Sequence, residues 1–293
     1  MNELAGAIVS SVFLGTALGL MALAFTIVYT VSQVFNFAVG QYMILGALLS
    51  TAVHFTASPG VNDLIAVVLV AAMGSATYLV ALRWPETHGA KPLTLVIITF
   101  GVGIIIEQVA IMAWGSYPLS EPPILAGHFL LYGNLVPDQG LLLVAVAAVV
   151  VAGLGVAQRR TIVGKQFLAL GANRATARYF GLNDLVLVTL AWGLSGAVLA
   201  LAGTLYLPLT GVSITTDLSY GVGAFAAAVI GGLGNPGGAL VGGLIVAFVT
   251  NLMGVYVNPN LTDLLTFGLL FVFLVFRPGG LTGNVADLVG PRA

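Results

Sequence analysis

Long apolar runs separated by short polar interruptions occupy most of this chain. A membrane-spanning α-helix needs about 20 mainly apolar residues. The pattern therefore predicts an all-α, polytopic membrane protein with eight to nine transmembrane helices, some of them short or broken. The expected spans are residues 4–31, 36–55, 61–82, 92–114, 139–157, 185–209, 238–257 and 262–276, and the shorter run 219–234 either spans the membrane or only re-enters it.

Composition supports a membrane protein and excludes several classes. Charged residues make up only 6% of the sequence and hydrophobic residues 59%, whereas a typical soluble domain has roughly 25% charged residues. The absence of cysteine excludes disulfides and thiolate metal sites. No basic stripe suited to nucleic acid is present. The apolar run from Leu4 is longer than a signal-peptide core of about 7–15 residues, so we expect a retained transmembrane helix.

The few charges predict the orientation of the chain, because Lys and Arg near spans favour the cytoplasmic side. The loops 83–91 and 158–184 carry basic residues, whereas the loop 115–138 carries none. We therefore expect the first two loops to be cytoplasmic, the third to be external, the N-terminus outside and the C-terminus in the cytoplasm. With no linker or charge block, residues 1–293 form a single transmembrane domain. Five of the nine Lys and Arg residues lie in one interruption: Arg159, Arg160, Lys165, Arg174 and Arg178.

Polar residues inside the expected spans are the candidates for a functional path. An ionised side chain at mid-bilayer costs about 2.5–3.5 kcal/mol on insertion scales. Glu107 should therefore face a polar cavity or another subunit, or be protonated and hydrogen-bonded between helices. Gln33, Asn36 and Gln41, with Ser32, form a second polar group. They could line one path only if the backbone is broken there, and the alternative is that these groups hold helices together.

Glycine patterns predict close packing and one tight turn. The G-x-x-x-G pairs at residues 15–19 and 238–242 allow close helix approach. Residues 232–237 match the G-x-G-x-x-G pattern, but they follow a membrane segment rather than a strand and include Pro236. We therefore reject a dinucleotide site and expect a tight cytoplasmic turn at 231–238. Interrupted segments in two halves of a chain often mark a transport path, and the stretches 32–47 and 213–228 are alike in plan.

No motif indicates catalysis. The sequence lacks H-E-x-x-H, G-x-S-x-G and the Walker A pattern G-x-x-x-x-G-K-[ST]. The histidines His54, His88 and His128 are too dispersed in the expected topology to form a metal site. We therefore expect no catalytic residue, no metal and no cofactor, and any nucleotide-driven work must come from another chain.

Four ordered segments resemble one transporter family. Residues 34–47 read VFNFAVGQYMILGA and resemble the N-F-A-x-G-x-x-x-x-L-G-A signature of permease subunits of branched-chain amino acid ABC importers. Residues 97–102 (IITFGV) with the downstream Trp114-Gly115, residues 174–183 (RATARYFGLN) and residues 223–234 (GAFAAAVIGGLG) agree in order and spacing. The resemblance covers nearly the whole chain.

The resemblance implies a non-enzymatic permease in a bacterial or archaeal cytoplasmic (inner) membrane. Its implied partners are a second homologous permease, two cytoplasmic ATP-binding subunits and an extracytoplasmic substrate-binding protein. For such a permease we expect a substrate path that includes Gln33, Asn36, Gln41, Thr99 and Glu107. Loop 164–184 resembles the loop that couples to the ATPases, with a short helix over 169–180 that a groove could receive. Its candidate coupling residues are Gly164, Ala169, Arg174, Ala177, Arg178 and Gly181.

The substrate and the mechanism have alternatives. Many relatives carry His-Gly-Glu where this chain has Val39-Gly40-Gln41. An uncharged lining suits branched-chain or other neutral amino acids, and alternatively amides or urea; a sugar permease of a related importer is another alternative. A proton-coupled secondary transporter would instead use Glu107. The positive charges of loop 164–184 could also do no more than set the topology.

Overall fold

The computed structural model describes residues 2–52, 58–115, 123–131, 133–211, 217–256, 262–277 and 279–282. As expected, it is a helical bundle, and every apolar run named above contains a helix. Within the described ranges, six helices are long and apolar enough to cross a membrane, and shorter apolar helices accompany them. The elements are α1 (Asn2–Ser32), α2 (Val39–Ala52), α3 (Pro59–Thr77), η1 (Tyr78–Leu82), α4 (Arg83–Thr87), α5 (Pro92–Trp114), β1 (His128–Leu131), β2 (Asn134–Pro137), α6 (Asp138–Arg160), α7 (Ile162–Ala172), α8 (Arg174–Tyr179), α9 (Asp184–Thr210), α10 (Asp217–Gly231), α11 (Pro236–Tyr256) and α12 (Thr262–Phe276).

Helix α1 lies in the centre of the bundle and packs on α11 through glycine. A Cβ atom added to Gly15 would lie 2.7 Å from the Cα atom of Leu244, and one added to Gly243 would lie 2.4 Å from the backbone oxygen of Gly15. A Cβ on Gly242 would lie 2.0 Å from the backbone oxygen of Ala227 in α10. The close approach predicted from the two G-x-x-x-G pairs is therefore confirmed.

Helices α3 and α9 form a second close pair. A Cβ on Gly74 would lie 2.5 Å from the backbone oxygen of Trp192, and one on Gly196 would lie 2.6 Å from that of Val70. The Ser75 hydroxyl also donates a hydrogen bond to the Thr189 carbonyl at 3.3 Å. Because small residues let the two backbones come this close, the pair has little room to slide.

The backbone is broken between α1 and α2, which is the condition for the polar residues there to line one path. The Ser32 hydroxyl donates to the Val28 carbonyl at 2.8 Å and accepts the Val34 N–H at 3.3 Å, which ends α1. Gln33 follows with φ of 57°, a left-handed conformation that non-glycine residues seldom adopt. Helix α2 then begins at Val39 and has only 14 residues.

The short helix α10 lies against the start of α2. A Cβ on Gly221 of α10 would lie 3.8 Å from the backbone nitrogen of Gly40. Residues 213–216 of the second similar stretch lie outside the described residues, so the internal repeat stays a prediction. The turn between α10 and α11 has Gly232 and Gly234 at φ of 97° and 95°, which confirms the tight turn expected there.

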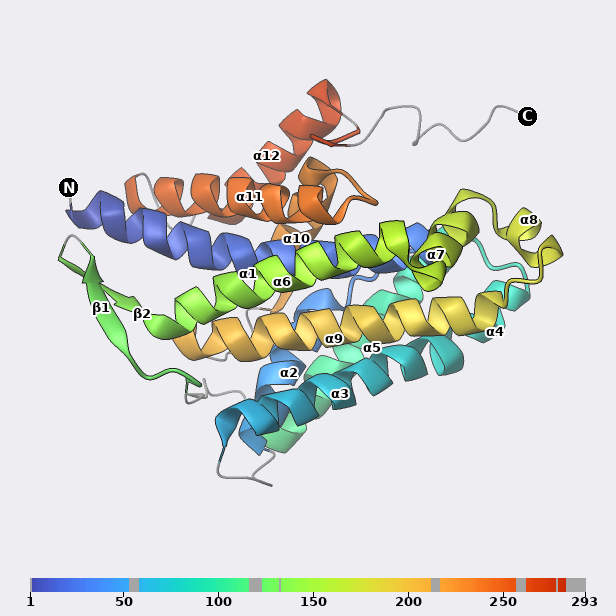
Figure 1. Ribbon diagram of the computed structural model, residues 1–293, viewed down its shortest axis with the longest axis horizontal. Coiled ribbons are helices and arrows are strands. Elements are labelled where there is room, and N and C mark those ends of the chain that lie inside the picture. Colours follow the sequence, from blue (N-terminus) through green and yellow to red (C-terminus); the bar gives the residue numbers. More distant parts are fainter. Residues whose placement is uncertain are drawn as a thin grey trace.

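The two ends of the bundle differ (Figure 1). At one end β1 and β2 form an antiparallel hairpin in which His128 pairs with Pro137; at the other end lie α4, α7 and α8. The hairpin occupies part of loop 115–138; residues 116–122 and 132 lie outside the described residues. Gly6 of α1 lies next to the Asn134 side chain, so α1 starts at the hairpin end.

Both basic loops lie at the end of the bundle opposite the hairpin. The Arg174 and Glu86 side chains form an ion pair there, so the loops 83–91 and 158–184 are in contact. Gly280, close to the end of the described chain, packs against Gly232 in the α10–α11 turn. A shared end for the two basic loops agrees with the expectation that both face one side of the membrane. His54 and Arg292 lie outside the described residues.

Candidate functional site

Thr99 of α5 holds the broken segment in place. Its hydroxyl accepts the backbone N–H of Phe37 at 3.1 Å and lies 3.2 Å from the carbonyl oxygen of Phe35, to which it can donate. The Asn36 side-chain oxygen accepts the Ala38 N–H at 3.1 Å, a local turn that precedes α2. Thr99 and Asn36 are both buried. The structure therefore brings these two predicted path residues together at the break.

Gln41 and Glu107 meet a few residues further along α2 and α5. They line one cavity of about 10 Å³ together with apolar side chains. Gln41 is buried and Glu107 is half-buried. Gly103 makes this approach possible, because a Cβ there would lie 3.1 Å from the Gln41 side-chain oxygen. A cavity of this size has room for about one water molecule and not for an amino acid.

An aromatic group surrounds the same break. Phe35 stacks on Tyr29 with ring centroids 4.7 Å apart, and Phe225 of α10 packs edge-on against Phe35 at 5.6 Å. Phe225 also lies 5.7 Å from the Phe37 ring. Aromatic rings from α1 and α10 therefore surround the break, and Thr99 of α5 forms hydrogen bonds with its backbone. Gln33 is exposed and takes part in neither arrangement.

The loop after α6 contains two helices instead of the single helix expected over residues 169–180, so that expectation was wrong. Asn173 adopts an extended conformation between α7 and α8, and its side-chain oxygen accepts the Thr176 N–H at 2.9 Å. Asparagine competes for backbone donors in this way and favours a cap over a helix interior. The cap ends α7 and starts α8.

The predicted coupling residues differ in burial, and Arg174 is half-buried. Gly164 and Ala177 are buried, and a Cβ on Gly164 would lie 2.2 Å from the Ala157 carbonyl oxygen, so glycine permits the turn from α6 to α7. Ala169, Arg178 and Gly181 are exposed. Gly181 has φ of 78° and ends α8, in the left-handed conformation typical of a helix stop.

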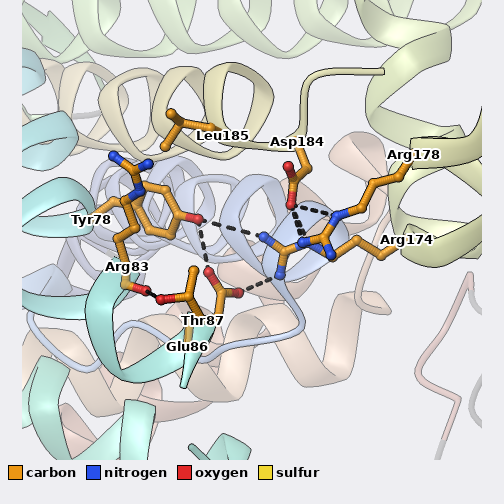
Figure 2. A pocket seen from close by; sticks show the side chains of 8 residues that line it. All are labelled: Tyr78, Arg83, Glu86, Thr87, Arg174, Arg178, Asp184 and Leu185. Carbon is orange, nitrogen blue, oxygen red and sulfur yellow. Dashed lines mark hydrogen bonds and ion pairs between the residues drawn. The ribbon is translucent and has the colours of Figure 1, made fainter. Parts of the chain in front are cut away.

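Arg174 lies between two carboxylates at the end of the bundle that carries the basic loops (Figure 2). Its Nη1 atom donates to Glu86 of α4, and its Nε atom lies 3.4 Å from Oδ2 of Asp184 at the start of α9. Arg178 donates to the same Asp184 oxygen from Nε at 3.0 Å. Tyr78 donates its hydroxyl to Oε2 of Glu86 at 2.8 Å. We refer to Tyr78, Glu86, Arg174, Arg178 and Asp184 as the Arg174 cluster; it borders a cavity of about 270 Å³.

Electrostatics keep Arg174 charged in this partly buried position. Burial by itself lowers the pKa of a guanidinium, but the hydrogen bond and the charge of Glu86 outweigh it, and the pKa of Arg174 lies above its ordinary value. The Arg174 side chain is 26% exposed and that of Glu86 16%. The ion pair is therefore shielded from water and salt more than a surface pair is.

Sequence reasoning missed several residues of this end. Tyr78 and Glu86 lie 96 and 88 residues before Arg174, and no local sequence pattern connects them with it. Asp184 lies only 10 residues after Arg174. Sequence reasoning also missed Tyr179 and Phe180, which the structure shows to be 91% and 83% exposed. An adjacent Tyr-Phe pair within the basic interruption 158–184 was the available signal.

Comparisons with known proteins agree along almost the whole chain. The family described as branched-chain amino acid transport system / permease component matches residues 7–274. BraD, a high-affinity branched-chain amino acid transport system permease protein of Pseudomonas aeruginosa, is 25% identical over 294 residues, which cover 94% of this chain and 95% of BraD. The probable branched-chain amino acid transport permease protein LivH of Methanocaldococcus jannaschii is 29% identical over 303 residues, covering 96% and 91%.

Two further similarities are more distant. The ribose import permease protein RbsC of Escherichia coli is 27% identical over 241 residues, covering 79% of this chain and 73% of RbsC. The solved structure of PsaBC from Streptococcus pneumoniae in complex with Fab aligns with a TM-score of 0.53 at 13% identity, covering 95% of this chain and 93% of that one. At this identity the structural likeness concerns the fold alone.

Proposed function

Because this chain belongs to the family of branched-chain amino acid transport permease components, we propose that it forms the translocation path of an ABC importer for branched-chain or other neutral amino acids. The observation that carries the proposal is the family match over residues 7–274, which takes in the bundle from α1 to α12. The chain is thus a multi-pass inner-membrane permease subunit and not an enzyme, and it works with ABC partner subunits.

The proposed assembly has a second homologous permease, two cytoplasmic ATP-binding subunits and an extracytoplasmic substrate-binding protein. ATP hydrolysis takes place on the ATP-binding subunits. In this assembly the end with α4, α7 and α8 faces the cytoplasm, because it carries the basic loops. The hairpin β1–β2 and the N-terminus then face outward.

Within this proposal the substrate path runs past the break between α1 and α2. Gln41 and Glu107 contribute polar groups to its wall, Asn36 and Thr99 hold the broken backbone, and Gln33 lies at its exposed edge. The cavity beside Gln41 is too small for an amino acid. The path therefore opens in another conformation or is completed by the second permease, as alternating access requires.

The loop 164–184 is the proposed contact with the ATP-binding subunits. Tyr179 and Phe180 project from the end of α8 and are almost fully exposed. Aromatic side chains that enter a groove dominate many protein interfaces. We assign the main contact energy to these two residues, whereas Ala169, Arg178 and Gly181 are smaller or charged exposed residues and Arg174 is held by Glu86.

Serine at positions 179 and 180 tests this contact. Loss of a hot-spot aromatic anchor costs about 2 kcal/mol or more, so Tyr179→Ser with Phe180→Ser should raise the dissociation constant for the ATP-binding subunits at least about thirtyfold and lower their co-purification. Phe271→Ser, which changes a 68% exposed aromatic on α12, is the matched control and should leave co-purification unchanged. Equal recovery of the subunits with both variants would contradict the assignment.

Uptake in proteoliposomes tests the function itself. The chain is reconstituted with the permease, ATP-binding subunits and binding protein encoded beside it, and labelled leucine, an amide, urea and ribose are compared. We expect ATP-dependent uptake of leucine. Uptake of ribose instead would favour a sugar permease, which the similarity to RbsC makes the second candidate. Uptake by the chain alone, driven by a pH gradient without ATP, would favour a proton-coupled carrier.

A further inference from the structure

The Arg174 guanidinium connects three elements that are far apart in the sequence. It pairs with Glu86 of α4 and with Asp184 of α9, while its own backbone belongs to α8 (Figure 2). A planar guanidinium with several fixed donors can hold two carboxylates at once, whereas a lysine ammonium is a single point charge. Arg174 is therefore suited to keep α8 at a fixed position relative to both neighbouring spans.

Tyr78 extends this connection into the bundle. Nη2 of Arg174 lies 3.5 Å from the Tyr78 hydroxyl, which itself donates to Glu86. The Tyr78 ring stacks on Trp192 of α9 with centroids 6.5 Å apart and planes 19° apart. Tyr78 also starts η1, a π-helical turn between α3 and α4, and π-turns inside helices occur frequently at functional sites.

Other contacts of α8 with the bundle are few. Asn173 alone separates α8 from α7, and residues 180–183 connect it to α9. Ala177 is its buried residue, and the remaining side chains of α8 are exposed or half-buried. The position of α8 therefore depends largely on the ion pairs of Arg174 and Arg178.

We propose that Arg174 is a positioning residue that fixes α8 to α4 and α9, so that a displacement of α8 by the ATP-binding subunits reaches the α3–α9 pair. The inference rests on the proposed function for the source of the displacement. The α3–α9 pair receives it as one unit, because Gly74 and Gly196 bring the two backbones into direct contact. Without Arg174, a displacement of α8 is not transferred to α3 and α9.

The first test measures the mobility of α8 in the full chain. Since the sequence has no cysteine, Ala175→Cys, at an exposed position of α8, gives a single site for a spin label in lipid nanodiscs. Arg174→Ala and Glu86→Gln should each shift the spectrum toward a mobile component. Arg159→Ala, an exposed arginine at the end of α6, is the matched control and should leave the spectrum unchanged.

The second test measures coupling in the assembled importer. Substrate transported per ATP hydrolysed should fall about tenfold in Arg174→Ala, within the range typical of coupling between two sites, while the amount of assembled complex stays the same. Arg174→Lys should lie between Arg174→Ala and the unchanged protein. If Arg174 and Glu86 act together, the double variant Arg174→Ala with Glu86→Gln should be no worse than the worse single variant.

The outcomes separate the inference from the proposed function. An unchanged spectrum in both Arg174→Ala and Glu86→Gln would overturn the inference even if the importer works. The inference would also be overturned if the variants assembled less complex but transported the normal amount of substrate per ATP hydrolysed. Arg174 would then serve folding alone. If the unaltered assembly shows no ATP-driven uptake, the proposed function is wrong, and the spin-label spectra still decide whether Arg174 holds α8.

Discussion

At the scale of single residues, hydroxyl and amide side chains hold together a backbone that has left helical geometry. Backbone groups in a bilayer must find partners inside the protein, because lipid offers none. Thr99 accepts the Phe37 N–H and shares its single hydroxyl proton between the Val96 and Phe35 carbonyls, and Asn36 accepts the Ala38 N–H. These residues therefore shape the break.

Removal of the Thr99 hydroxyl should destabilise this region. Thr99→Val keeps the shape of the side chain but removes the acceptor of the Phe37 N–H and the proton that the Phe35 and Val96 carbonyls share. An unsatisfied buried group costs about 1–3 kcal/mol, so the purified variant should unfold at a lower temperature in a thermal-shift assay. Thr99→Ser retains the hydroxyl and should stay close to the unaltered protein. Identical melting of the valine and serine variants would argue against this role.

At the scale of elements, small residues decide which helices pair. Helix α1 meets α11, and α3 meets α9, at positions where glycine removes the side chain between two backbones. Dispersion contacts and close packing drive such pairing in membranes, where apolar side chains gain little from leaving lipid. The central position of α1 follows from these contacts.

Alanine at a contact glycine should disturb the α1–α11 pair. In Gly243→Ala the new Cβ atom would lie 2.4 Å from backbone atoms of both Gly15 and Gly19. Overpacking of this kind typically costs 1–3 kcal/mol, so less folded protein should be recovered and its melting temperature should fall. Gly153→Ala in α6 is the matched control, because no atom lies within 4 Å of its new Cβ. A similar result for the two variants would contradict the packing argument.

At the scale of the whole molecule, the hairpin and the N-terminus lie at one end and the basic loops at the other. The basic end carries α8 with Tyr179 and Phe180, and the Arg174 cluster connects it with the spans. This arrangement places the proposed ATPase contact and the proposed external surface on opposite sides of the bilayer.

Cysteine labelling in intact cells checks this orientation. Leu130→Cys lies in the hairpin, where residue 130 is 71% exposed, and Thr176→Cys lies at an exposed position of α8. A membrane-impermeant maleimide should label the first variant and not the second, and both should react after the cells are opened. The opposite pattern in intact cells would mean that the basic end faces outward.

The sequence by itself determined the helical class, the positions of the apolar segments and the basic loops. These follow from properties that act along the chain, since a bilayer requires about 20 apolar residues per span and positive charges near spans favour one side. The family could likewise be recognised from four ordered segments, and the match over residues 7–274 confirms it. The turn at 231–238 followed from local glycine geometry.

Only the tertiary structure decided which helix faces are buried and which distant side chains meet. Helices α1 and α5 are both apolar on every side. Nevertheless, 89% of an 18-residue apolar stretch of α1 is buried inside the protein, compared with 28% of the corresponding stretch of α5. An apolar pattern without periodicity cannot indicate the buried face. The contacts of Thr99 with Phe37 and of Arg174 with Glu86 join residues 62 and 88 positions apart, so they depend on how the helices pack and rotate against one another.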